Sequence, residues 1–306
     1  MLKFRLATVA WSVIYLLLLL TLLTPLKMIT VFFLIVPGAV LFSSLHFKGF
    51  LIHVIPVLLI IAFLDVYSLL LAIYFLIPSV LMGWIYKKGG PAFQALMTGM
   101  GVILAELLVV LLVATYSFGF DLSQYLRDQA AMTANIVQQI FSANPMFSGA
   151  LWTAEDTQKL GTMLIGKVPY VLIVTSFLLA VLTHALVRPA LSSLDMPVHK
   201  MKPAREWRLP RALIWYYLLA IVIEWIANSS DGSWIQMVSI SMLPLIHACF
   251  TIQTIGFVYF WTHSRQMSSV IALLLSLVVL IVQPLYIIGI IDLAFPLREA
   301  ITRSKK

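Results

Sequence analysis

The chain has 306 residues, of which 62% are hydrophobic and 10% are charged, and its net charge is +8. Typical globular domains are about 45–50% apolar and about 25% charged, so this composition excludes an ordinary soluble domain and suits a protein whose exterior faces lipid. The single cysteine, Cys249, excludes an internal disulfide, a cysteine zinc site and a dithiol redox motif, while the scattered basic residues give no support for nucleic acid as a partner.

Apolar segments of helical length follow one another along the whole chain. A helix needs about 20 apolar residues to cross the hydrocarbon core, and the third and seventh segments are shorter than that. The sequence therefore predicts an all-α, polytopic transmembrane helix bundle with about nine segments, in a range of about eight to ten. The segments cover residues 7–25, 29–46, 50–64, 67–85, 93–116, 168–187, 212–227, 234–262 and 268–291.

The positions of the basic residues predict the orientation of these segments. Lysine and arginine in short loops stay on the cytoplasmic side of a membrane. Lys3 and Arg5 therefore predict a cytoplasmic N-terminus, and alternation brings Lys48, Lys87 and the basic loop 188–211 to the same side. We expect a multi-pass protein of the bacterial plasma membrane.

The basic C-terminus does not fit this alternation. The cations from Arg298 to Lys306 would lie outside the cell if the ninth segment crossed the membrane once. Either that segment bends back at Pro284, or one segment elsewhere is miscounted. We favour a miscount, because a cluster of terminal cations normally stays inside.

The stretch 117–166 is predicted to form amphipathic helices outside the cytoplasm. Asp121 with Gln124, and Thr153 with Asp156, are typical of a helix N-cap and its capping-box partner. Such a helix either lies on the outer membrane surface or forms a lid over a site. Its apolar residues recur at helical spacing: Leu122, Tyr125, Leu126, Met132, Ile136, Val137, Ile140 and Phe141.

These features divide the chain into three parts. Residues 1–187 form a membrane unit of six segments that includes the amphipathic helices, residues 188–211 form a basic cytoplasmic loop, and residues 212–306 form a C-terminal extension of three segments. The loop is the clearest boundary.

Glu106 is the clearest candidate for a functional residue, because an ionisable group inside a bilayer costs about 2.5–3.5 kcal/mol at a helix centre. Gly99 lies seven residues earlier, and small residues around it predict that this side of the helix faces other helices. The carboxyl either binds a solute or ion, with Gly99 beside it, or ties two helices together. The small residues are Ala95, Gly99, Gly101 and Ala105.

His247 and Gln253 in the eighth segment are further candidates for ligand contacts. A lone histidine on a membrane helix, such as His247 or His184, more often makes a hydrogen bond between helices than it binds a metal. We therefore predict no metal site. Prolines interrupt five segments and favour a bundle that encloses a cavity. They are Pro37, Pro56, Pro78, Pro244 and Pro284.

Signatures of enzymes are missing from the sequence. It contains no His-Glu-x-x-His, no Gly-x-Ser-x-Gly and no P-loop, and no paired aspartates suit an intramembrane protease. We expect a protein without enzymatic activity and without a cofactor. Energy for any active transport would have to come from an ion gradient or from a partner.

Several motifs are distinctive as sequences. They are Arg188–Leu191, Trp207–Pro210, Ile214–Tyr217, Gln253–Phe257 and Ile291–Arg298. With these motifs the chain resembles, over nearly its whole length, the YybS-like family of predicted bacterial membrane proteins, a family of unknown function. None of the motifs is catalytic, so the resemblance implies a fold and a location.

The YybS-like family is in turn distantly similar to the substrate-binding S components of energy-coupling-factor transporters. Those are six-helix bundles that capture vitamins or metal ions from outside, and the first six segments match their count and orientation. Two features depart from the pattern: Ala7 and Ala10 do not give the usual Ala-x-x-x-Ala of the first helix, and the three segments after residue 211 have no counterpart.

The resulting prediction is a membrane protein that binds or helps to transport a small solute within its first six helices. Its expected partners are the lipid bilayer, an unknown small solute, and ATPase or coupling subunits or other membrane proteins. The alternative is a scaffold or regulatory protein that organises envelope or sporulation partners through its helices and basic loop.

Overall fold

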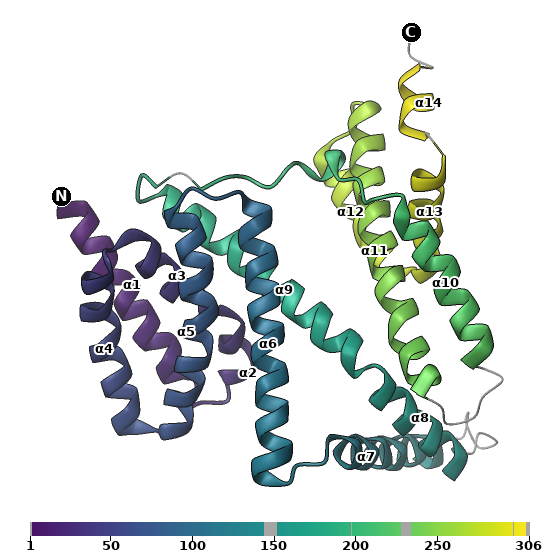
Figure 1. Cartoon of the computed structure of the whole chain (residues 1–306), viewed down its shortest axis with the longest axis horizontal. Coiled ribbons are helices and arrows are strands. Elements are labelled where there is room, and N and C mark those ends of the chain that lie inside the picture. The colour runs from purple at the N-terminus through teal and green to yellow at the C-terminus, as the bar shows by residue number, and fades with distance from the viewer. Residues whose placement is uncertain (1, 144–151, 197, 228–233, 296, 304–306) are drawn as a thin grey trace. The chain divides into compact units, whose positions relative to one another are not determined.

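The computed structural model describes residues 2–143, 152–196, 198–227, 234–295 and 297–303, and the described part is helical with no strands. This confirms the predicted all-α class. Each of the nine predicted apolar segments coincides with a helix or with adjoining helices. The chain divides into two compact units, which Figure 1 shows in one view: residues 1–118 with 172–201, and residues 119–171 with 202–306.

Six of the described helices or adjoining pairs are long and apolar enough to cross a membrane, and a seventh span results if a bent pair is counted as one. The helices α1 and α10 are apolar but shorter in their described parts. The protein is therefore a polytopic membrane helix bundle.

The first unit contains the first six predicted segments. They form a bundle whose helices are joined by short turns, apart from the long connection that leaves the unit after α6 and returns along α9. The helices are α1 (Leu2–Thr21), α2 (Lys27–Thr30), η1 (Val31–Phe33), α3 (Ile35–Ser44), α4 (Phe47–Leu64), α5 (Val66–Lys87), α6 (Ala92–Phe118) and the part of α9 (Val168–Ser192) from residue 172 onwards.

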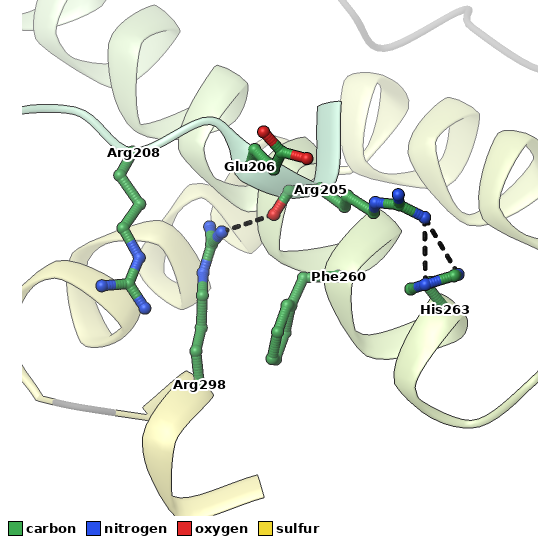
Figure 2. A pocket seen from close by; sticks show the side chains of 6 residues that line it. All are labelled: Arg205, Glu206, Arg208, Phe260, His263 and Arg298. Atoms are coloured by element: carbon green, nitrogen blue, oxygen red, sulfur yellow. Dashed lines mark hydrogen bonds between the residues drawn. The ribbon is translucent and has the colours of Figure 1, made fainter. Parts of the chain in front are cut away.

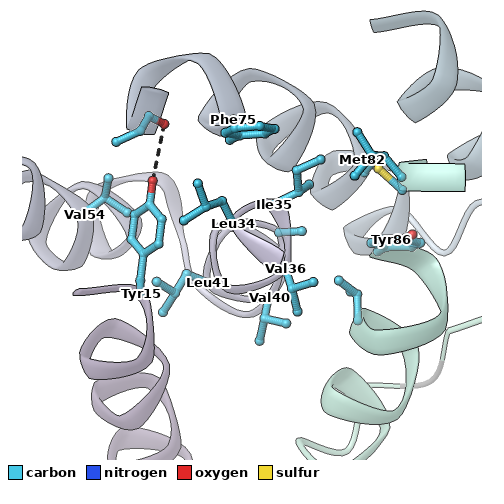
Figure 3. Packing of buried hydrophobic residues seen from close by; sticks show 14 of the residues in the cluster. Tyr15, Leu34, Ile35, Val36, Val40, Leu41, Val54, Phe75, Met82 and Tyr86 are labelled. Carbon is cyan, nitrogen blue, oxygen red and sulfur yellow. Dashed lines mark hydrogen bonds between the residues drawn. The ribbon is translucent and has the colours of Figure 1, made fainter. Parts of the chain in front are cut away.

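The core of the first unit is centred on α3, which is surrounded by apolar side chains of neighbouring helices (Figure 3). Small residues let α3 and α5 approach closely: a Cβ at Gly38 would lie 2.8 Å from Oγ of Ser79. The Ser79 hydroxyl donates to the Ile35 carbonyl at 2.9 Å and so crosses the interface. Close approach and interhelical hydrogen bonds drive such packing in membranes, where lipid is as apolar as leucine.

The second unit combines the amphipathic helices with the C-terminal extension. Its long central helix is α11, which packs against most of the other elements. The helices are α7 (Leu122–Ala143), α8 (Ala154–Gly166), η3 (Ala204–Glu206), α10 (Ala212–Ala227), α11 (Trp234–Ser264), α12 (Ser269–Ile281), η4 (Gln283–Leu285), α13 (Tyr286–Ala294) and α14 (Leu297–Arg303).

The ninth predicted segment is broken at Pro284. The helices α12 and α13 meet at 115°, with Pro284 in the 3₁₀ turn between them. Proline has no backbone N–H to continue the helical hydrogen bonds, which makes it a natural point for such a break. Of the two explanations for the basic C-terminus, the structure shows the bend at Pro284 that the less favoured one requires.

The other four prolines that interrupt apolar segments of the sequence do not break their helices. Pro56, Pro78 and Pro244 lie inside α4, α5 and α11, and Pro37 lies in the first turn of α3. Within a bundle, neighbouring groups compensate for the lost hydrogen bond. Of the five prolines, only Pro284 redirects the chain.

The amphipathic stretch belongs to the second unit, which differs from the predicted boundary at residue 187. The end of α8 packs on α11, because Gly166 lets Ile240 approach: a Cβ there would lie 2.8 Å from Cγ2 of Ile240. The Ser241 hydroxyl donates to the Gly166 carbonyl at the same place. These interactions attach α7 and α8 to the C-terminal helices.

The helix caps of this stretch follow the prediction in one case and depart from it in the other. Thr153 and Asp156 form both bonds of the capping box at the start of α8. Asp121 caps α7 by accepting from the N–H groups of Ser123 and Gln124 at 2.8 and 3.0 Å. The Gln124 side chain, however, donates to Asp128 one turn later, so the predicted box partner of Asp121 is wrong.

The surface of α7 is amphipathic as predicted. Its small residues Ala130 and Ala134 are buried, and Ala130 lies against Gly161 of the partner helix α8. Large apolar residues remain exposed on α7: Tyr125, Met132, Ile136 and Ile140. In Figure 1 α7 does not run parallel to α11 of its own unit. An exposed apolar stripe on a helix between two membrane segments suits a helix in the plane of the membrane surface.

Candidate functional site

Glu106 lies on the inner side of α6 in the first unit. Gly99 and Ile103 precede it at helical spacing and are both buried, so all three residues share the face that packs on α5. Both carboxyl oxygens of Glu106 are buried, and neither has a hydrogen-bond partner among the described residues. The prediction that Glu106 faces neighbouring helices is confirmed.

Tyr74 of α5 is the second polar group at this place. Its hydroxyl is buried without a hydrogen-bond partner in the described part of the chain, and it is close enough to Glu106 for the two side chains to interact electrostatically. A buried polar group without a partner is unusual in a folded protein and calls for an explanation such as an absent ligand or water. Glu106 and Tyr74 together present one carboxyl and one phenol within the bundle.

In the structure, Gly99 lies at the contact between α6 and α5 and serves helix packing. A Cβ at this position would lie 2.5 Å from Sδ of Met82, so the glycine is what allows α6 to approach α5. The small-residue face is narrower than predicted: Ala95 and Gly99 are buried, whereas Gly101 and Ala105 are exposed. At about 100° per residue, Gly101 and Ala105 lie about 200° and about 240° around the helix from Gly99, so both belong to the face opposite the buried one.

His247 lies in an aromatic cluster of the second unit. Its ring stacks on Tyr286 of α13, with centroids 4.0 Å apart and planes 18° apart, and it lies 5.7 Å from the ring of Tyr217 of α10. Its Nε2 is buried without a hydrogen-bond partner among the described residues. The histidine therefore joins three helices through ring contacts.

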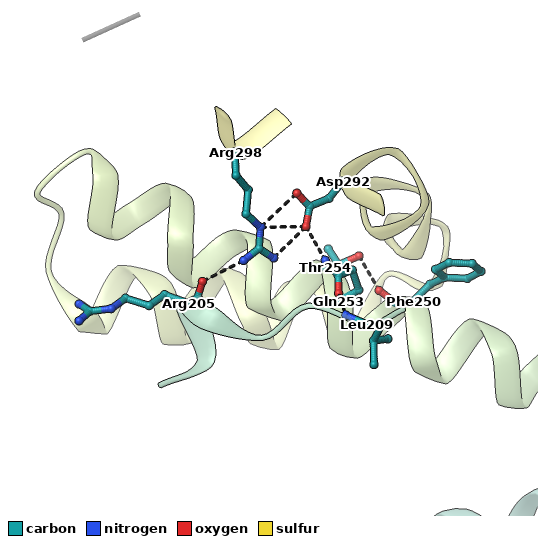
Figure 4. A network of polar contacts seen from close by, with 7 residues as sticks. All are labelled: Arg205, Leu209, Phe250, Gln253, Thr254, Asp292 and Arg298. Atoms are coloured by element: carbon teal, nitrogen blue, oxygen red, sulfur yellow. Dashed lines mark hydrogen bonds and ion pairs between the residues drawn. The ribbon is translucent and has the colours of Figure 1, made fainter. Parts of the chain in front are cut away.

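Gln253 belongs to a buried polar network (Figure 4). Its Oε1 accepts from the N–H of Leu209 at 2.9 Å, and its Nε2 donates to Oδ2 of Asp292 at 2.5 Å. Asp292 in turn forms an ion pair with Arg298 at 2.8 Å, and the two side chains are 1% and 4% exposed. Arg298 also donates to the Arg205 carbonyl at 2.9 Å.

This network attaches residues 202–211, the part of the basic loop that belongs to the second unit and hereafter the basic segment, to the C-terminal helices. The Gln253 amide oxygen accepts from the backbone just before α10, and the amide nitrogen donates to the Asp292 carboxylate of α13. Arg298 of α14 closes the network onto η3. Both ends of Gln253 are therefore engaged within the protein.

The four residues that were predicted to contact a ligand lie in two different units. Glu106 and Gly99 belong to the first unit, and His247 and Gln253 belong to the second. Within the described residues no group of three or more His, Cys, Asp or Glu side chains could hold a metal ion.

Sequence reasoning did not identify two polar neighbours in the first unit, Tyr74 of Glu106 and Tyr86 of His184. Tyr74 was not expected beside Glu106, because a tyrosine within an apolar segment carries no signal of its neighbours. His184 was expected to join helices, and its Nδ1 does lie 3.1 Å from the Tyr86 hydroxyl of α5. The identity of that partner could not be read from the sequence.

Comparisons with known proteins agree with a membrane protein. The family described as "Predicted membrane protein (DUF2232)" matches residues 12–293. The chain is 20% identical over 231 residues to the "Uncharacterized protein YybS" of Bacillus subtilis (strain 168), an alignment that covers 73% of each protein. No solved structure matches the chain significantly.

Proposed function

The chain belongs to the DUF2232 family of predicted membrane proteins, and from this premise we propose that it is a binding or transport-related subunit for a small, positively charged solute. The observation that carries the proposal is the Glu106 carboxyl, which is buried within the first unit without a hydrogen-bond partner among the described residues. Ionisable groups inside membrane helices mark solute and ion pathways.

The chemistry of the site favours a cation. A carboxylate surrounded by apolar side chains is strongly disfavoured unless a positive charge or hydrogen-bond donors accompany it. A bound cation would supply the charge, and the Tyr74 hydroxyl would supply an oxygen to the solute or a donor to the carboxylate. With a single carboxyl and no cluster of metal-binding side chains among the described residues, an organic cation suits the site better than a metal ion.

The helix count of the first unit supports a role like that of the S components. Its six apolar segments, α1, α2 with α3, α4, α5, α6 and α9, are the number that such subunits use to hold a solute. Under this proposal the protein acts with ATPase or coupling subunits as partners, since the chain has no nucleotide-binding motif of its own.

Thermal unfolding of the full chain in detergent tests the proposal. The probes are thiamine and choline as organic cations, nickel and cobalt chlorides as metal ions, and riboflavin as an uncharged control. A cation that binds only the folded protein, supplied at about 100 times its dissociation constant, stabilises it by about 2.7 kcal/mol. We expect at least one cation, and not riboflavin, to raise the unfolding temperature.

Three variants show whether Glu106 is responsible. Glu106→Gln should abolish the stabilisation, and Tyr74→Phe should weaken it. Glu224→Gln is the matched control, because Glu224 is an exposed carboxyl on the apolar helix α10. The proposal is wrong if Glu106→Gln responds to the probes as the unsubstituted protein does, or if no probe stabilises the unsubstituted protein.

A scaffold or regulatory protein is the second candidate. It is favoured by the buried network that holds the basic segment in a fixed conformation while Lys202 and Arg211 stay exposed. Replacing both cations by glutamate should then release specific co-purifying membrane proteins without changing the unfolding temperature. Unchanged co-purification would argue against this candidate.

A further inference from the structure

An open pocket of about 410 Å³ lies where the basic segment meets the C-terminal helices (Figure 2). The segment around η3 forms one wall, the last turns of α11 form the floor, and α14 closes the other side. Four of the six lining residues are arginine or histidine. The lining residues are Arg205, Glu206, Arg208, Phe260, His263 and Arg298.

The backbone that carries these side chains is firmly held. Gly256 of α11 allows the segment to lie directly on the helix, since a Cβ there would be 3.2 Å from the carbonyl oxygens of Ala204 and Trp207. The Trp207 ring N–H donates to the Lys202 carbonyl at 2.7 Å and closes a short loop. The cations are thus presented from a preformed backbone, which reduces the ordering cost of binding.

Not all of the charged side chains in the pocket are paired with other groups among the described residues. Arg298 is paired with Asp292, but Arg208 has no hydrogen bond or ion pair among the described residues. Arg205 points one nitrogen at the His263 ring, 2.9 Å from its Nε2, which leaves most of its five N–H donors free. Glu206 lowers the net positive charge of the pocket without removing these donors.

The pocket lies at one end of a membrane span. His263 is in the last turn of α11, whose apolar window covers residues 235–264. A helix of this length leaves the hydrocarbon core near its last turn, at the level of the lipid headgroups. Phe260, one turn earlier, adds an aromatic ring to the lining of the pocket.

We propose that this pocket binds a phosphate ester, either the headgroup of an anionic lipid or a soluble phosphate ester. Arg205 and Arg208 supply planar guanidinium groups whose N–H donors suit phosphate oxygens, and His263 adds a ring nitrogen. Phe260 contacts the carbon skeleton next to the phosphate. Basic pockets between membrane helices bind anionic headgroups by this combination of charge and apolar surface.

Native mass spectrometry and thermal unfolding of the full chain test this site. The lipid probe is dioleoyl-phosphatidylglycerol with dioleoyl-phosphatidylcholine as its zwitterionic control, and the soluble probe is sn-glycerol 3-phosphate. Arg208→Gln and Arg205→Gln should each weaken binding about 10-fold or more, the loss expected for a charge-assisted hydrogen-bonded pair. Arg211→Gln is the matched control, because Arg211 is an exposed arginine of the same segment outside the pocket.

The two probes distinguish the sources of the phosphate. Binding of phosphatidylglycerol that is lost in Arg208→Gln and kept in Arg211→Gln supports a lipid site, and the same pattern with glycerol 3-phosphate alone supports a soluble ligand. The proposal is overturned if neither probe binds, or if Arg211→Gln loses as much affinity as Arg208→Gln, which would indicate general surface charge. Arg208 has no hydrogen bond or ion pair among the described residues, so its variant should unfold at an unchanged temperature without ligand.

Discussion

At the scale of single residues, two glycines show how differently the same substitution should act. A Cβ at Gly289 of α13 would overlap the Phe250 carbonyl oxygen of α11, whereas a Cβ at Gly101 of α6 would meet nothing within 4 Å. Backbone cannot move aside, so Gly289→Ala should destabilise the protein by about 1–3 kcal/mol. Gly101→Ala should be neutral or stabilise by up to about 1 kcal/mol. Thermal unfolding in detergent measures both, and equal stabilities would contradict the close approach of α11 and α13.

The buried ion pair gives a second prediction at this scale. Removing Arg298 leaves the Asp292 carboxylate buried without its partner, which typically costs about 3–5 kcal/mol. Arg298→Met should therefore destabilise the protein strongly. Adding Asp292→Leu should recover only part of the loss, because the unpaired charge is removed but Gln253 Nε2 loses its buried acceptor. Unfolding by denaturant in detergent gives both values.

An exposed ion pair provides the control for that prediction. Lys159 and Glu155 are 2.7 Å apart on α8, but their side chains are 70% and 74% exposed. Water screens such a pair, so Lys159→Met should leave the stability unchanged within error. If Arg298→Met were equally harmless, the buried network would not hold the basic segment in place.

At the scale of elements, the cap of α8 should respond to acid. Hydrogen bonds from the Thr153 side chain and backbone lower the pKa of Asp156 below its ordinary value of 3.8. A lowered pKa in the folded state means that the carboxylate stabilises the cap above pH 3.8, and that this contribution is lost as the pH falls through the lowered pKa. Hydrogen exchange of the first turn of α8 should accelerate there relative to other helices.

A capping variant separates this effect from general acid unfolding. Thr153→Ala removes the hydroxyl that both accepts from the Asp156 N–H and donates to its carboxylate. The first turn of α8 should then exchange faster at neutral pH and lose most of its specific acid response. A variant that kept the full acid response would show that the capping box does not control this turn.

The helices themselves could be predicted because hydropathy and length are local properties of the sequence. The direction of the chain after a break is not local: Pro284 marks a possible break in residues 268–291, but the sequence does not distinguish it from the four prolines that leave their helices continuous. Gln124 shows the same limit on a small scale. Asp121 and Asp128 both lie within its reach, and the helix geometry favours the partner one turn later.

The candidate site was predictable in part for the same reason. The face of α6 that carries Glu106 follows from helical spacing and from the expense of a carboxyl in lipid. Its neighbour Tyr74 follows from how α5 packs on α6, which depends on close approaches such as that of Gly99 to Met82. Likewise the Asp292–Arg298 pair could be predicted from nearness in sequence, whereas the bond of Gln253 to the Leu209 N–H joins residues 44 positions apart.

At the scale of the second unit as a whole, α11 determines which elements lie on the same side of the membrane. The helix α8 meets it at Ile240, and the basic segment meets it at Gly256. About sixteen residues of helix separate these positions by about 24 Å, most of the roughly 30 Å thickness of the hydrocarbon core. We therefore expect the amphipathic helices and the basic segment to belong to opposite membrane surfaces, and the bend at Pro284 to return the C-terminus to the surface of the basic segment.

Labelling of single cysteines tests this sidedness in membrane vesicles. In a Cys249→Ser background, Lys202→Cys, Thr302→Cys and Gln139→Cys all replace exposed side chains. A membrane-impermeant maleimide should label positions 202 and 302 from one side and position 139 from the other, and the excess of cations near 202 predicts that the first side is cytoplasmic. Labelling of 302 together with 139 would mean that α12 and α13 cross the membrane as one span, because only a straight ninth segment carries the terminal cations to the far surface.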